Sequence, residues 1–279
     1  MVSEYRQIIA ALYRLYQNSG FAMAGAVAFS FIVSLFPFSV FLGAIAGVFG
    51  GRQLAAQAID QMFAVLPKSV ADVLAPQIEQ IMGESRVGLL TLSGVLALFF
   101  ATTANETLRA ALNGAYRVTE KRPYLLCLAL SALFLTLMAL AMLVLAWVLV
   151  VGPNLVPLIK IPLLTSLFET DWFSTTLRYG FAGVVLAVYL LGVHLWLAAG
   201  NRKLRDVWPG VLLTICLMLA LAALYSRYLA FSTYTQFYEG PTQVMVALIF
   251  FQVTGIAILL GAELNRGIIE LSRLDLNEV

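Results

Sequence analysis

Long stretches without charged residues alternate along the chain with short segments that carry several charges. Six of the apolar stretches are long enough for a helix to cross the hydrocarbon core of a membrane, which takes about 20 residues at a rise of about 1.5 Å each. They cover residues 15–51, 87–105, 123–159, 179–201, 207–226 and 240–262. The pattern therefore predicts six membrane-spanning helices, centred near Val33, Leu96, Leu137, Val188, Leu217 and Phe250.

Prolines mark several of the predicted boundaries. Pro123, Pro209 and Pro241 each lie near the start of an apolar stretch, where the first helical turn has N–H groups without partners and a missing N–H costs little. Pro37 lies inside the first stretch instead, where its ring removes a hydrogen bond to the preceding turn. We therefore expect a kink or a break of the first span at Pro37.

Two further segments are amphipathic rather than uniformly apolar. Residues 3–18 place apolar side chains at helical spacing, with most polar ones elsewhere, which predicts a helix that either lies on the inner headgroups or packs under the bundle. Residues 52–85 alternate apolar and polar positions and are interrupted by Pro67, Pro76 and Gly83. They predict two or three short amphipathic helices that cap the outer face.

Composition agrees with a protein that lies within a membrane. Apolar residues make up 61% of the 279 and charged residues only 11%, against about a quarter charged in a soluble domain. The net charge of +2 shows no basic excess that would attract nucleic acid. We predict an all-α, polytopic membrane protein with a single domain, residues 1–279, and no cleaved signal peptide.

The positions of lysine and arginine predict the orientation of the spans. Eleven of the 17 lie in the N-terminal segment, the second-to-third and fourth-to-fifth connections, and the tail. The remaining six lie in the connections of the opposite side. Because basic flanks are retained on the cytoplasmic side, both termini are predicted to be inside.

The candidate functional residues are polar side chains near the inner ends of the spans, because a charge at membrane depth costs about 2.5 kcal/mol or more. Glu106, Arg109 and Asn113 recur with Tyr116 on one stripe of a helix that continues the second span. These residues either line a cavity, or Glu106 and Arg109 simply form an ion pair while long side chains extend to the interface.

The inner end of the sixth span carries Glu263 and Asn265. Gly261 precedes them, and a small residue there allows another helix to come close and to hold the carboxylate against a partner. We expect Arg109 or Arg117 to be the partner of Glu263. A lone carboxylate at the interface is the plainer interpretation.

His194 is the one histidine of the chain and lies about two turns from the inner end of the fourth span. It is either a hydrogen-bonded packing residue or a cavity-lining group that changes charge with pH. The nearby sequence holds no further metal ligands, and Cys127 and Cys216 both lie in apolar runs where they are expected to pack. We therefore expect no metal site, and the chain contains no cofactor-binding motif.

Charged residues also flank the predicted cavity on both sides. A basic rim lies just below it, formed by Arg109, Arg117, Arg202, Lys203 and Arg205. The rim suits phosphate groups of lipids or an anionic solute, or it is only the signal that sets orientation. At the outer end of the fifth span, Arg227 either extends outward, pairs with Glu239 or forms an outer polar gate.

Three motifs carry a resemblance to a known family. They are AVAFSFIVSLFPF at residues 26–38, NETLRAALNGAYR at 105–117 and LLGAELN at 259–265. In their order and spacing they resemble the YihY/BrkB family of bacterial inner-membrane proteins, over residues 20–266. Residues 250–254, FFQVT, depart from the family pattern, so no role is assigned to Gln252.

The resemblance implies a six-helix fold in the bacterial inner membrane with both termini inside. Transport of lipids or other envelope components has been suggested for the family, and a ribonuclease label has been used and disputed. No cluster of carboxylates able to hold two metal ions for phosphodiester cleavage is visible in the sequence, so we expect no enzymatic activity.

Two functions from different classes follow from these features. The first is a transporter-like or lipid-handling protein with a polar cavity toward the cytoplasmic leaflet, between the second, fourth and sixth spans. Its expected partners are membrane lipids and an anionic lipid or solute, without nucleic acid, and a homo-oligomer is compatible with it. The alternative is a non-transporting envelope scaffold or assembly factor that docks a partner through residues 52–85.

Overall fold

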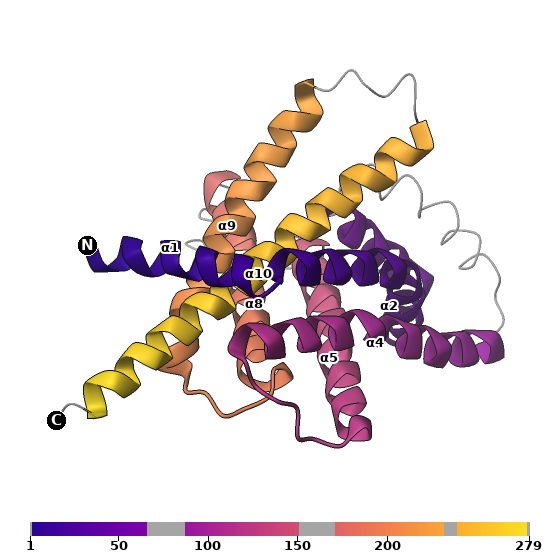
Figure 1. Cartoon of the computed structure of the whole chain (residues 1–279). Helices are drawn as coiled ribbons and strands as arrows, with labels where there is room; N and C mark the ends of the chain where they lie inside the picture. Colours follow the sequence, from indigo (N-terminus) through magenta and orange to yellow (C-terminus); the bar gives the residue numbers. More distant parts are fainter. Residues whose placement is uncertain (1, 66–86, 151–170, 232–238, 278–279) are drawn as a thin grey trace, which may run out of the picture.

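The computed structural model describes residues 2–65, 87–150, 171–231 and 239–277, which are helical apart from short connections (Figure 1). The helices are α1 (Val2–Gln17), α2 (Gly20–Val65), α4 (Val87–Tyr116), α5 (Tyr124–Val150), α8 (Asp171–Gly192), the π-helical turn η2 (Val193–Leu197), α9 (Leu204–Phe231) and α10 (Glu239–Asn277). Within these residues there is no strand, which confirms the predicted all-α class.

Five of the described helices contain a segment that is long and apolar enough to cross a membrane. The segments are Gly20–Gly43, Tyr124–Val144, Gly180–Leu197, Leu204–Leu224 and Met245–Leu271. They match the first, third, fourth, fifth and sixth predicted spans and indicate a multi-pass membrane protein. The second predicted span, residues 87–105, is part of α4 and is not among the five, so the count of six and the inside position of both termini stay predictions.

The first long helix extends further than the sequence pattern predicts. Residues 52–65, expected as a separate short helix, are the end of α2. The prediction was wrong because a change from apolar to polar side chains does not interrupt backbone hydrogen bonds, so a helix can continue through it. The rest of the predicted outer segment, residues 66–86, lies outside the described residues.

The prolines also differ in part from expectation. Pro37 lies inside α2, which stays helical on both sides of it. The predicted break is therefore wrong. The other predicted possibility, a kink within a continuous helix, stays a prediction. The nearby Ser39 hydroxyl donates a hydrogen bond to the Leu35 carbonyl at 2.7 Å, a local side-chain bond that helices accommodate.

The start of α9 is set by a side-chain cap rather than by Pro209. The Asp206 carboxylate accepts a hydrogen bond from the Lys203 backbone N–H at 3.2 Å. This is the return contact of a capping box, in which a residue three positions into the helix satisfies the N–H of the cap. The helix therefore begins at Leu204, and Pro209 lies in its second turn.

The bundle is organised around α10, which packs along α9 and α2 and also contacts α1 and α4 (Figure 1). Near the site described below, α9 and α10 approach through two glycines. A Cβ on Gly210 would lie 2.1 Å from the Gly261 carbonyl oxygen, and a Cβ on Gly261 would lie 2.5 Å from that of Gly210. The close helix contact predicted at Gly261 is thus confirmed, with α9 as the neighbour.

Replacing Gly210 with alanine should destabilise the protein, because the added methyl group overlaps the α10 backbone. Overpacking of this kind costs about 1–3 kcal/mol in the free energy of unfolding. Thermal unfolding in detergent measures the change. The matched control is Gly183→Ala in α8, where a Cβ meets nothing within 4 Å and alanine favours the helix. Equal melting temperatures for the two variants would contradict the tight contact.

Candidate functional site

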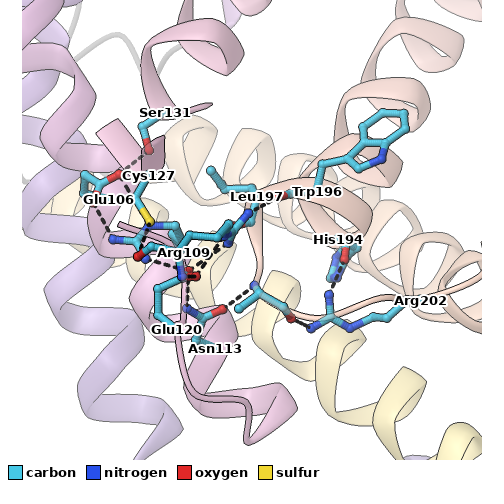
Figure 2. A network of polar contacts seen from close by, with 12 residues as sticks. Glu106, Arg109, Asn113, Glu120, Cys127, Ser131, His194, Trp196, Leu197 and Arg202 are labelled. Carbon is cyan, nitrogen blue, oxygen red and sulfur yellow. Dashed lines mark hydrogen bonds and ion pairs between the residues drawn. The ribbon is translucent and has the colours of Figure 1, made fainter. Parts of the chain in front are cut away.

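The second half of α4 brings together most of the polar residues predicted from the sequence. Glu106, Arg109 and Asn113 recur every three or four residues and therefore lie along one side of the helix. Figure 2 shows them close to Glu120, from the connection after α4, and near the turn η2. This part of α4, with the residue after it, contributes side chains to three neighbouring networks of polar contacts.

The first network is a chain of alternating charges. Arg109 forms an ion pair with Glu106, and its Nη1 donates to the Glu120 Oε2 at 2.9 Å. Arg122 Nη2 donates to the same Glu120 oxygen at 2.8 Å, while the Ser131 hydroxyl of α5 donates to Glu106. The hydrogen bonds from Arg122 in particular, with further ones from Asn113 and Arg109, hold the pKa of Glu120 well below its ordinary value. The chain carries no net charge, and it contains the ion pair considered above.

Two arginines end the helix formed by α8 and η2. Arg122 donates to the carbonyls of Trp196 and Leu197, both at 2.9 Å. Arg202 donates to the carbonyl of His194 at 2.9 Å and to that of Ala199. The last carbonyls of a helix have no partners within it, and cations are favourable at this end. The two guanidinium groups therefore stabilise the position of η2.

Asn113 links α4 to the connection that follows η2. Its Oδ1 accepts a hydrogen bond from the Ala199 backbone N–H at 2.7 Å, and its Nδ2 donates to Glu120 Oε2 at 3.2 Å. Because a backbone N–H can only donate, these two contacts settle which end of the amide is oxygen. Asn113 thus joins the first network to η2.

The second network is centred on the buried Tyr116 hydroxyl. It lies 2.8 Å from His194 Nδ1 and 3.1 Å from Asn265 Nδ2. On its other side, Asn265 Oδ1 accepts from the Gly210 backbone N–H at 2.7 Å. The guanidinium carbon of Arg202 lies 3.6 Å from the centre of the Tyr116 ring, in a cation–π arrangement. Residues of η2 and α10 therefore meet at this hydroxyl of α4, and α9 is joined to it through Asn265.

The donors and acceptors in this second network have one consistent direction. The Gly210 N–H donates to the Asn265 oxygen, so the Asn265 NH₂ donates to Tyr116. The arrangement that also uses the Tyr116 hydrogen has its O–H donating to His194 Nδ1. This arrangement assigns to His194 the neutral tautomer with its proton on Nε2. That nitrogen is buried and has no hydrogen-bond partner among the residues that the structure describes.

The third network surrounds the Glu263 carboxylate, which is only 1% exposed. Arg14 Nε lies 3.5 Å and Arg117 Nη2 lies 4.0 Å from its Oε2. Asn18 Nδ2 donates to Oε1 at 3.3 Å. Of the two partners predicted for Glu263, Arg117 is therefore the one found, while Arg109 belongs to the first network.

The predicted site residues thus fall into neighbouring networks rather than one constellation. No recorded contact joins any two of Glu106, His194 and Glu263, although each contacts residues of the second half of α4 or the residue after it. Asn113 joins the first network and Asn265 the second. Arg227 is exposed and lies about 25 Å along α9 from Gly210. The Glu239 side chain, its predicted partner, lies outside the described residues.

Several residues of the networks were not predicted from the sequence. Glu120 and Arg122 lie in a short charged connection that looks like any basic flank of a span. Arg14 and Asn18 lie almost 250 positions from Glu263, and no local pattern indicates that contact. Tyr116 was placed on the correct stripe, but its role depends on partners from other helices.

The described part of the chain contains no group of three His, Cys, Asp or Glu residues that could hold a metal ion. Of the two cysteines expected to pack, Cys127 is buried but Cys216 is exposed. Cys216 faces outward from α9, so the expectation that it packs was wrong.

Comparison with known proteins gives one family and one curated relative. The family described as "Virulence factor BrkB" matches residues 11–276. The relative is the "Putative ribonuclease-like protein YfkH" of Bacillus subtilis (strain 168). It is 26% identical over 253 residues, which cover 89% of this chain and 90% of the relative. No solved structure matches the chain.

The tautomer of His194 can be read directly, because the chain has one histidine. In protein labelled with ¹⁵N-histidine, we expect the ring signals of a neutral imidazole that is protonated at Nε2. Tyr116→Phe removes the donor to Nδ1 and should shift the signals toward a mixture of tautomers. Tyr124→Phe, the same change at an exposed tyrosine, should leave them unchanged. A wild-type imidazole protonated at Nδ1 would contradict the direction of the network.

The first network should make stability depend on pH through Glu120. Its pKa is lower in the folded protein than the ordinary value of about 4.3, so its stabilisation is complete above that value. The stabilisation is lost as the pH falls through the lower, folded pKa. Glu120→Gln should therefore lower the melting temperature at neutral pH, since hydrogen bonds to charged groups contribute about 1.5–3 kcal/mol.

The difference between wild type and Glu120→Gln should begin to shrink below about pH 4, where the carboxylate of the unfolded chain becomes protonated, and should shrink further as the pH approaches the lower pKa of the folded state. Thermal unfolding followed at a series of pH values measures it. A difference that stays constant down to acid pH would show that the charge of Glu120 is not what stabilises the network.

Proposed function

The chain belongs to the virulence factor BrkB family, and we propose that it is a transporter-like or lipid-handling membrane protein with a polar region toward the cytoplasmic leaflet. The observation that supports this most is the second network, which runs from Gly210 through Asn265 and Tyr116 to His194. Its members on η2, α9 and α10 lie in segments long and apolar enough to span a membrane. Its last member is the buried Nε2 of His194, which has no hydrogen-bond partner among the described residues.

The free-energy cost of burying an unpaired polar group favours a functional role for this network over a role in helix packing alone. An unpaired buried donor costs about 1–3 kcal/mol, and an apolar contact between the same helices would avoid this cost. Polar groups at membrane depth commonly mark the route of a substrate, an ion or a proton. A polar group that passes His194 would supply the missing acceptor.

The local backbone supports the same interpretation. His194 lies in the π-helical turn η2 at the end of α8. Single π-helical turns occur frequently at functional sites. The carbonyls of this turn are held by two arginines rather than by a continuing helix. The position of His194 is therefore set by contacts from outside its own helix.

We do not propose nuclease activity for this chain on the basis of its Bacillus relative. The words "putative ribonuclease-like" describe that relative. Two-metal cleavage of a phosphodiester needs clustered carboxylates, whereas Glu106 and Glu120 are here engaged by arginines. We therefore propose a function without catalysis.

Reconstitution into liposomes tests the proposal. Transbilayer movement of a fluorescent phospholipid and efflux of an entrapped anion would be measured in vesicles of phosphatidylethanolamine and phosphatidylglycerol. We expect one of the two activities in the wild type. We also expect Tyr116→Phe to lower it about tenfold, which corresponds to about 1.4 kcal/mol of lost stabilisation.

The matched control for this measurement is Tyr124→Phe, which removes an exposed hydroxyl and should leave the rate unchanged. Equal rates for the two variants would contradict the role of the second network. If the wild type moves neither lipid nor anion, and cross-linking recovers one stoichiometric protein partner, the protein is instead an envelope scaffold.

A further inference from the structure

The surroundings of Glu263 contain more positive than negative charge. Arg14 of α1 and Arg117 after α4 lie 3.5 and 4.0 Å from its Oε2, and Arg266 follows Glu263 by three residues on α10. Among the side chains that the structure describes, Glu270 is the only other carboxylate in contact with them, and it pairs with Arg266. Three guanidinium groups therefore face two carboxylates. We call Arg14, Arg117 and Arg266 the arginine cluster.

The arginine cluster has unused hydrogen-bonding capacity. Each guanidinium offers five N–H donors. Arg266 Nη1 is buried without a hydrogen-bond partner among the described residues, and Arg14 Nε, also without one, faces the equally unpartnered Glu263 Oε2 at 3.5 Å. Arg117 comes no closer than 4.0 Å to Glu263, and its side chain is 37% exposed. A ligand with several anionic oxygens would find both charge and donors here, and Arg117 provides access from outside.

The backbone holds Arg117 in an unusual conformation. Its φ of 51° lies in the left-handed region, where it ends α4 with hydrogen bonds from Arg117 N–H to the Gly114 carbonyl and from Val118 N–H to that of Asn113. Glycine adopts this conformation most readily, whereas other residues have a steric cost of about 1–2 kcal/mol. Ser19 adopts the same conformation, with a φ of 56°, and strained positions of this kind cluster at ligand-binding sites and switch regions.

The surface of α1 next to the arginine cluster suits a membrane. Its inner side buries Ala11 and Leu15, while the outer side exposes large apolar and aromatic residues. The exposed residues are Ile9, Leu12, Tyr13 and Tyr16. Helices with such a face and nearby arginines lie at the boundary between headgroups and acyl chains.

The path of Arg14 between α1 and α10 depends on a glycine. A Cβ on Gly267 would lie 2.5 Å from Arg14 Nη2. The guanidinium therefore crosses α10 over Gly267, and its Nη2 donates to the Glu263 carbonyl at 3.2 Å. The apolar face of α1 and the charge of the arginine cluster are thus held together.

We propose that the arginine cluster binds the phosphate of an anionic lipid headgroup, in competition with the Glu263 carboxylate. The phosphate oxygens take the donors that Glu263 leaves unused, and the acyl chains lie along the exposed face of α1. That apolar face is the reason to favour a lipid over a free phosphate ion. The proposal goes beyond the proposed function, since the site anchors a lipid whether or not the protein moves one.

Binding of short-chain lipids to the purified full-length protein in a neutral detergent tests the proposal. The probes are dioctanoyl phosphatidylglycerol, dioctanoyl phosphatidylcholine and inorganic phosphate, and calorimetry gives the dissociation constants. We expect saturable binding of phosphatidylglycerol and at least tenfold weaker binding of the other two. Equally tight binding of inorganic phosphate would overturn the assignment to a lipid.

Two substitutions are expected to act in opposite directions. Arg117→Gln removes a charge-assisted contact and should weaken phosphatidylglycerol binding about tenfold. Glu263→Gln removes the competing carboxylate and should strengthen binding several-fold, with a larger rise in melting temperature on lipid addition. A purely structural ion pair predicts no gain for Glu263→Gln, so unchanged or weaker binding in that variant would overturn the proposal.

The control is Lys121→Gln, which removes an exposed positive charge from the connection after α4, outside the basic rim. It should change the dissociation constant less than twofold. A loss equal to that of Arg117→Gln would show a general effect of positive charge and overturn the site. If Arg117→Gln fails to fold, the sign of the Glu263→Gln effect still decides between the two interpretations.

Discussion

The hydrogen bond between the Tyr116 hydroxyl and His194 Nδ1 is the contact on which the rest of the arrangement depends. Within a membrane, polar groups must find partners inside the protein, so each one placed between helices constrains its neighbours. The direction of this hydrogen bond traces back to the Gly210 backbone N–H, which reaches Asn265 because Gly210 and Gly261 let α9 and α10 approach closely. The close packing of α9 against α10 therefore also determines the direction of the hydrogen bonds that lead to His194.

The three networks differ in charge, and this difference separates their roles. The first network, from Glu106 to Arg122, has no net charge and its charged groups are paired. This is expected of a network that stabilises the position of η2. The network at Tyr116 carries a direction and ends on an unpaired donor. The arginine cluster carries excess positive charge near an exposed apolar surface. A packing function alone explains the first network but not the other two.

Sequence patterns predicted the features that depend on neighbours along the chain. The apolar stretches located five segments found in the structure, and the period of α4 placed Glu106, Arg109 and Asn113 on one side. Contacts between distant segments were beyond the same reasoning. Arg14 reaches Glu263 only because α1 crosses α10 at Gly267. Likewise, the length of α2 follows from backbone hydrogen bonds that ignore the change in side-chain polarity at residue 52.

Two helices connect the network at Tyr116 with the arginine cluster. On α10, Glu263 and Asn265 are two residues apart and therefore point to nearly opposite sides of the helix. On α4, Tyr116 is the last helical residue and Arg117 follows it in the left-handed position that ends the helix. The arginine cluster therefore lies directly beside the network at Tyr116, one residue away along the chain at the end of α4 and two residues away on α10. The two polar groups share the end of α4 as a common support, because Tyr116 and Arg117 belong to the same helix terminus.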